Sequence, residues 1–236
     1  MVQDSNVGRL PVLRKVSKTK TIAATGLFAS LAIILTALSQ FAGLNFPIVP
    51  YLQFDFGEVA ILLAFFAFGP VPAIASAVVE FVTLMALGQN VPIGPVFKLL
   101  AILSTLGGLW LGVAVVRKIS PFSKRGVTLG SSLGLGLIFR AVVMTVGNYY
   151  LIVYVYTIAG IVGFVTASFK LVGITITSTN TLALVLTFTA IFNCLQLLLV
   201  FGISYLFFRL PQLRNILRAN RMAWFESLGS KPPSEK

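Results

Sequence analysis

Four charged side chains lie inside or at the edges of long apolar stretches of this 236-residue chain: Glu58, Glu80, Lys98 and Arg140. A charge at the centre of a bilayer costs at least about 2.5–3.5 kcal/mol, so such a residue usually faces an opposite charge, a cavity or a bound molecule. Lys98 falls near the end of its apolar stretch, which favours contact with a ligand. Arg140 lies deeper, which favours a role in holding helices together. Pairing among these charges is the structural alternative, because it leaves none of them uncompensated.

A second acid precedes Glu58 at the start of its apolar stretch. Asp55 is predicted to cap the helix that follows, because a carboxylate there accepts hydrogen bonds from free backbone N–H groups. Glu58 lies one turn further along the chain, where a bound ligand and a partner charge are both reasonable interpretations.

Three side-chain amides lie within the later apolar stretches: Asn148, Asn193 and Gln196. An amide offers two donors and an acceptor, which is the pattern needed to bind the edge of a heterocycle. Asn193 and Gln196 are three residues apart and share one helix face, so hydrogen bonds between helices are the alternative role. Tyr149 follows Asn148 and is a further candidate contact.

Small residues recur four positions apart in the first apolar stretch. Gly26 and Ser30 form one pair, and Thr25 and Ala29 form a second pair beside it. Such pairs let helix backbones approach closely. This face is expected to serve either internal packing or contact with a partner subunit.

The composition is that of an integral membrane protein. Only 10% of the residues are charged, against about 25% in soluble domains, and the mean hydropathy is +0.97. The chain has no histidine, which disfavours zinc hydrolases and haem proteins. Phosphate-binding loops and nucleophile motifs are also missing from the sequence. We therefore expect a protein that is not an enzyme and has no metal or cofactor, so any ATP hydrolysis would occur on another chain.

Six apolar segments are read as membrane-spanning helices, which need about 20 residues each, and the second of them is short. They are Thr21–Ala42, Gln53–Phe68, Ala73–Leu87, Gly94–Val116, Thr128–Tyr150 and Leu182–Phe208. A tight break at Gly69–Pro72 separates the second segment from the third. The sequence therefore predicts an all-α membrane protein with six transmembrane helices.

The distribution of positive charge predicts the orientation. The net charge is +12, but Lys and Arg gather in the N-terminal tail, between the fourth and fifth spans, and in the C-terminal tail. This pattern is typical of cytoplasmic segments and not of a nucleic-acid-binding surface. We expect a cytoplasmic tail at 1–20, a membrane domain at 21–208 and a second cytoplasmic tail at 209–236. Tyr156–Thr177 is interpreted as an outer-face loop, since a seventh span would place the basic C-terminal tail outside. The tail at 229–236 is expected to be disordered.

Several short motifs resemble one known family. They are Phe54–Ala60 continuing to Phe68-Gly69-Pro70, Val91–Pro95, Met144–Tyr150, Ala190–Asn193, and the small residues from Gly26 to Ser30. In order and spacing they are similar to motifs of the substrate-binding S components of energy-coupling factor (ECF) transporters, and most similar to the riboflavin-specific group. The resemblance covers about residues 21–208.

The sequence departs from that riboflavin-specific pattern at several positions. Gln196 stands where the group carries a Lys, and Lys98 stands near the place of an Asn. Glu80 is unexpected in its span, and Gly26 with Ser30 replaces a pair of alanines. Lys98 would then offset the Lys that is missing at Gln196, or the ligand would differ.

The resemblance implies a multi-pass protein of the prokaryotic plasma membrane that binds a vitamin from outside. It would dock on a transmembrane coupling subunit that works with two ATPase subunits. The implied ligand contacts are Asn148, Asn193, Gln196 and Lys98, with Asp55, Glu58, Glu80 and Tyr149 as further candidates. The implied partner contacts are Gly26, Ser30, Thr25 and Ala29. Two alternatives remain: an S component for thiamine, folate or a queuosine precursor, and a stand-alone carrier with a proton relay through Glu80 and Arg140.

Overall fold

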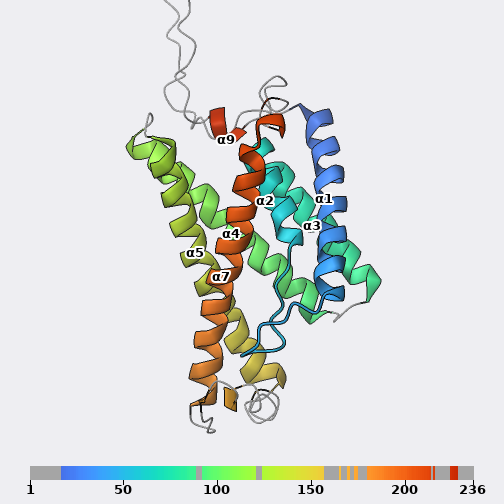
Figure 1. The fold of residues 1–236 in the computed structure, drawn as a ribbon, viewed down its shortest axis with the longest axis vertical. Helices are drawn as coiled ribbons and strands as arrows, with labels where there is room; N and C mark the ends of the chain where they lie inside the picture. The colour runs from blue at the N-terminus through green and yellow to red at the C-terminus, as the bar shows by residue number, and fades with distance from the viewer. Residues whose placement is uncertain are drawn as a thin grey trace, which may run out of the picture.

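A computed structural model describes residues 17–88, 92–120, 124–156, 165, 169–170, 173–174, 180–213, 215 and 224–227. Within these residues the chain forms a helical bundle (Figure 1). The helices are α1 (Lys18–Phe41), α2 (Gly57–Phe68), α3 (Pro70–Leu87), α4 (Ile93–Ile119), α5 (Arg125–Tyr150), the π-helix η1 (Leu151–Tyr156), α7 (Thr181–Arg209) and α9 (Trp224–Ser227). The prediction of an all-α protein is confirmed for this part of the chain.

Five helices of the described chain are long and apolar enough to cross a membrane: α1, α3, α4, α5 with its η1 extension, and α7. The second predicted span differs from the prediction. It does not begin at Gln53, because the helix starts at Gly57 and has 12 residues. At 1.5 Å per residue, α2 is about 18 Å long, which is shorter than a hydrocarbon core of about 30 Å.

The short helix α2 lies at the centre of the bundle. It contacts α1, α3 and α7, and almost all of its residues are buried. An apolar surface on nearly every side suits a helix in a protein core or in lipid, and the sequence of α2 has such a surface apart from Glu58. Its position therefore makes it the core around which the longer helices pack.

A single residue separates α2 from α3. Gly69 has a positive φ of 93°, a region that favours glycine, and α3 begins at the next residue. Pro70 takes the first position of α3, where the missing N–H has no helical partner in any case. The predicted break at Gly69–Pro72 is thus shorter than expected, since Pro72 is already helical.

Helices α4 and α5 pack through small residues. A Cβ on Gly108 would lie 2.6 Å from the carbonyl oxygen of Leu135, and one on Gly112 would lie 2.4 Å from Cα of Ser132. The Ser132 hydroxyl donates to the carbonyl oxygen of Leu109 at 2.6 Å. Close approach of this kind is how membrane helices associate without a hydrophobic driving force between them.

Helix α5 runs on without interruption into η1. The predicted fifth span ended at Tyr150, with an outer segment from Leu151, but the chain remains helical to Tyr156. Most of Tyr156–Thr177, interpreted from the sequence as an outer loop, lies outside the described residues, as does the tail at 229–236.

Basic helix ends lie together at one end of the bundle, called the basic end below (Figure 1). The starts of α1 and α5 and the ends of α4 and α7 meet there. Their basic residues are Lys18, Lys20, Arg117, Lys118, Lys124, Arg125 and Arg209. The connection from residue 42 to residue 56 lies in the opposite half.

Part of the predicted C-terminal tail folds back onto the bundle at the basic end. In α9, Trp224 and Phe225 are both 4% exposed. The Trp224 ring packs against Phe65, with 5.2 Å between ring centroids, and Phe225 packs against Phe66 at 5.5 Å. Helix α9 therefore covers the end of α2.

Candidate functional site

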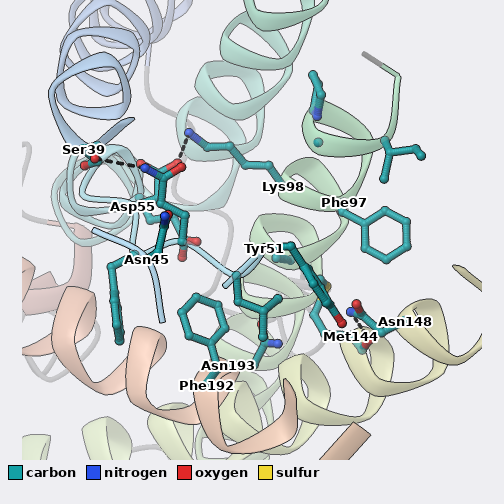
Figure 2. Close-up of a pocket in the computed structure, with 18 of the residues that line it drawn as sticks. Ser39, Asn45, Tyr51, Asp55, Phe97, Lys98, Met144, Asn148, Phe192 and Asn193 are labelled. Carbon is teal, nitrogen blue, oxygen red and sulfur yellow. Dashed lines mark hydrogen bonds and ion pairs between the residues drawn. The ribbon is translucent and has the colours of Figure 1, made fainter. Parts of the chain in front are cut away.

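A cavity of about 600 Å³ opens in the half of the bundle opposite the basic end. Its walls come from the end of α1, the connection 45–55, and parts of α2, α3, α4, α5 and α7. Figure 2 shows Asn45 and Asp55 on one side, Lys98 and Phe97 on another, and Asn148 and Asn193 from the helices that complete the wall; the Tyr51 side chain points toward Asn148. The volume is in the range of small-molecule sites.

Lys98 joins three other parts of the chain at the cavity wall. Its Nζ lies 2.7 Å from Glu80 Oε1, and it also pairs with Asp55 and donates to the hydroxyl of Thr36. The Thr36 hydroxyl lies within hydrogen-bonding distance of Asp55 Oδ1 (2.9 Å) and Glu80 Oε1 (2.8 Å). We call these four residues the Lys98 network. It connects α1, α3 and α4 to the residues that precede α2. Figure 2 shows the pair between Lys98 and Asp55.

Arg140 forms a second, separate set of contacts. Its guanidinium pairs with Glu58 through two bonds, of which Nη2 to Oε1 is 2.8 Å. Nε donates to Asn193 Oδ1 at 3.1 Å, and Nη1 donates to the Thr105 hydroxyl at 3.2 Å. These four residues, the Arg140 network, link α5 to α2, α4 and α7. Pairing of the buried charges, which was the structural alternative from the sequence, therefore occurs, and each basic residue takes its own acids.

Asp55 also shapes the start of α2. The backbone N–H of Gly57 donates to Asp55 Oδ1 at 2.7 Å, although Phe56 holds the N-cap position itself. A Cβ on Gly57 would lie 2.1 Å from Thr36 Oγ1 and 2.7 Å from the carbonyl oxygen of Ala32. Glycine is therefore required where α2 starts against α1, and this contact brings Asp55 beside Thr36.

The three candidate amides have different surroundings. Asn148 lines the cavity, and its Nδ2 donates to the carbonyl oxygen of Met144 at 2.8 Å. Asn193 also lines the cavity, but its Oδ1 accepts from Arg140 and its Nδ2 donates to Thr189. Gln196 lies behind the wall and donates to the backbone carbonyl of Asp55 at 2.7 Å. Asn193 and Gln196 thus hydrogen-bond to other segments of the chain. This was the alternative to ligand binding that the sequence left open.

Aromatic side chains form the apolar part of the cavity wall. Phe54 and Phe192 pack with their ring centroids 5.0 Å apart, and Phe46 supports both of them. Tyr51 and Phe97 line the cavity from other sides (Figure 2). Flat surfaces of this kind suit the faces of a ring system.

The structure places the predicted ligand contacts in three groups. Asn148, Asn193, Lys98, Asp55 and Glu58 line the cavity, whereas Glu80 and Gln196 lie behind the wall and contact it through Lys98 and Asp55. Tyr149 does not line the cavity; it is 40% exposed and packs on Tyr150.

The predicted partner contacts on α1 divide between two faces. Gly26 and Ser30 are exposed, and the space around Gly26 is open. Thr25 is half-buried and Ala29 is buried against the bundle. Only the first pair is therefore accessible to a partner in this arrangement.

Sequence reasoning missed Thr36, the residue of α1 that touches both acids of the Lys98 network. A hydroxyl in an apolar helix is a weak signal, because such groups commonly bond to their own backbone. Ser30 and Ser39 of the same helix do this. Tyr51 and Asn45 were missed as well, because they belong to the irregular segment before α2.

Comparisons with known proteins agree with this arrangement. The chain matches the family described as "ECF transporter, substrate-specific component" over residues 20–217. A solved structure described as the S component of a bacterial ECF transporter superposes with a TM-score of 0.60 and 24% identity, covering 86% of this chain and 99% of that chain. At this identity the likeness shows a common fold. No curated protein sequence matches the chain. Because the family match extends over most of the sequence and the fold agrees with it, this chain belongs to the family of substrate-specific components of ECF transporters.

Proposed function

We propose that this S component captures riboflavin, or a closely related flavin, and delivers it to an ATP-driven coupling module. As a member of its family, the chain is a substrate-binding transporter subunit and not an enzyme. The observation that carries the proposal is the cavity of about 600 Å³ with aromatic walls and a cavity-facing amide. A tricyclic ring with a polyhydroxylated chain fits a site of this size and mixed polarity.

The aromatic walls suit the faces of the flavin ring. Phe54 and Phe192 already pack against each other at the cavity edge, and Tyr51 and Phe97 add further rings. Aromatic pairs contribute about 0.5–1.5 kcal/mol beyond the burial of their area. A planar ligand would gain such contacts on both of its faces.

Asn148 is the amide best suited to the polar edge of the ring. Its Nδ2 uses one N–H on Met144, and the described residues leave its second N–H and its Oδ1 without a hydrogen bond. A pyrimidine-like edge presents both donors and acceptors and would pair with these two groups. Asn193 and Gln196 would affect the ligand indirectly, because their hydrogen bonds hold Arg140 and Asp55 in position.

The orientation follows from the separation of the cavity from the basic end. If the basic end faces the cytoplasm, as the distribution of Lys and Arg predicts, the cavity opens toward the outside. The S component then takes its vitamin from outside a prokaryotic plasma membrane. Release to the inside would require the coupling subunit and its two ATPases, which the exposed Gly26 and Ser30 face of α1 would contact.

Another vitamin is the main alternative ligand, because thiamine, folate and a queuosine precursor are also heterocycles that would enter a cavity of this size. A stand-alone carrier is less well supported. Its relay would run through Glu80 and Arg140, but these residues pair with Lys98 and Glu58 respectively and belong to separate networks.

The first experiment is an absorbance spectrum of the detergent-purified protein, followed by titration with riboflavin and detection by flavin fluorescence. We expect bound flavin near one equivalent and quenching on titration. Asn148→Ala should weaken binding by about 1–3 kcal/mol, the cost of unpaired ligand groups. Tyr154→Ala is the matched control, since Tyr154 is 73% exposed and does not line the cavity. A colourless protein that fails to quench riboflavin would overturn the flavin assignment while leaving the family assignment intact.

A further inference from the structure

The charged groups at the cavity do not balance. Among the described residues, the two networks hold three carboxylates, on Asp55, Glu58 and Glu80, and two cations, on Lys98 and Arg140. Glu58 and Arg140 form a one-to-one pair. The surplus negative charge therefore belongs to the Lys98 network, where one ammonium is shared by two acids.

Both cations direct most of their N–H groups to other residues of the protein. An ammonium has three N–H donors, and those of Lys98 are directed to Asp55, Glu80 and Thr36. Arg140 uses four of its five N–H groups, two on Glu58 and one each on Asn193 and Thr105. Lys98 therefore has no N–H left for the phosphate or carboxylate of a ligand, and Arg140 has a single one.

The acids retain acceptor capacity. Glu80 is 1% exposed, and its Oε2 is buried with no hydrogen-bond partner among the described residues. Asp55 and Glu58 line the cavity directly. In a buried site such charges are weakly screened, so they repel an anionic group over several ångströms.

We infer that the surplus carboxylate of the Lys98 network makes the cavity reject anionic ligands, and that Glu80 is the residue that sets this specificity. The inference rests on the proposed function, because it concerns the ligand bound in that cavity. Uncharged or cationic vitamins bind, and their phosphorylated or carboxylated relatives do not. Glu80 acts through Lys98 and Asp55 and does not touch the ligand, since it lies behind the wall.

The binding test compares riboflavin with its 5′-phosphate, which differ by one anionic group. The wild-type protein should bind riboflavin at least about tenfold more tightly, the repulsion expected of one unit charge several ångströms away. Glu80→Gln should reduce this preference by roughly tenfold, because it removes the surplus charge and keeps the side-chain shape. The readout is the ratio of the affinities for riboflavin and for its phosphate. A variant that changed only the shape of the cavity would alter both affinities alike and leave this ratio unchanged. An unchanged ratio in Glu80→Gln would overturn the inference.

A second measurement needs no ligand. Glu80→Gln should raise the melting temperature of the empty protein, because Lys98 then pairs with Asp55 alone. Glu58→Gln is the matched control and should lower it, because Arg140 loses its only carboxylate partner among the described residues. If both variants lower the melting temperature alike, the Lys98 network carries no surplus charge and the inference fails.

The failure of the flavin assignment is distinguishable from the failure of this inference. If riboflavin does not bind, the same protein is heated with cationic thiamine and with anionic folate. Stabilisation by folate would contradict the inference. Stabilisation by thiamine, together with the opposite shifts of Glu80→Gln and Glu58→Gln, would support it with a different ligand.

Discussion

The guanidinium of Arg140 and the carboxylate of Glu58 meet edge to edge inside the bundle, with Nη2 2.8 Å from Oε1 and Nη1 bonded to Oε2. Both side chains are almost completely buried, at 3% and 6% exposed. The pair connects the long helix α5 to the short central helix α2 at the edge of the cavity. Its geometry therefore affects both the stability of the bundle and the shape of the site.

Removing one partner of this pair should be strongly destabilising. Glu58→Ala leaves the Arg140 charge buried without a carboxylate, and we expect a loss of about 3–5 kcal/mol in the free energy of unfolding. Thermal unfolding of the detergent-solubilised protein measures the effect. Arg125→Ala, at an exposed position, is the control and should change stability by less than about 0.5 kcal/mol. A small effect of Glu58→Ala would mean that the pair contributes little.

Thr36→Val tests the link between α1 and the two acids. Valine has nearly the same shape but no hydroxyl, so contacts with Asp55 and Glu80 are lost at a cost of about 1–3 kcal/mol. Ligand affinity should fall as well, because Asp55 loses a contact that orients it. Thr187→Val removes an exposed hydroxyl that bonds only within its own helix and is the matched control. Equal effects of the two variants on ligand affinity would contradict the role of Thr36.

Gly57→Ala should disrupt the start of α2. The added methyl group would lie 2.1 Å from Thr36 Oγ1 and 2.7 Å from the backbone oxygen of Ala32, so the helices must separate. We expect a loss of at least about 1–3 kcal/mol, as in other overpacked cores, and reduced ligand binding. Gly107→Ala is the control, because open space surrounds that position, and it should be neutral or stabilising.

The exposed small residues of α1 should serve transport and not ligand binding. Gly26→Leu, or Ser30→Leu, adds bulk to a face that the bundle leaves open. Uptake by cells that contain the coupling module should be lost, while ligand binding by the purified protein is retained. Gly130→Leu places the same bulk at an exposed position of α5 and should leave uptake unchanged. Loss of uptake in both variants would show that added bulk, and not this face, is responsible.

Much of the bundle was predictable because its signals are local. Long apolar runs mark the five long helices, and basic residues gather at their ends. The start of α2 was not predictable in the same way. The run from Phe54 to Phe68 is mostly apolar whether or not it is helical, and the close approach of Thr36 to Gly57 accompanies the start of the helix.

The site was predictable in its residue types but not in its pairings. Asp55 and Glu58 are one turn apart in the sequence, yet they bind different cations, Lys98 and Arg140, that come from different helices. Gln196 resembled a ligand contact, but the backbone carbonyl of Asp55 approaches it in the fold. Such choices depend on distances between helices, which no local pattern contains.

The length of α2 has a consequence for the depth of the bound molecule. This helix supplies about 18 Å along the centre of the bundle, and a bilayer core is about 30 Å thick. The cavity begins where α2 begins, since Asp55 and Glu58 line it. A substrate bound in the cavity would thus lie in line with α2 and below the membrane surface. Lipid-attached quenchers placed at graded depths would locate it there.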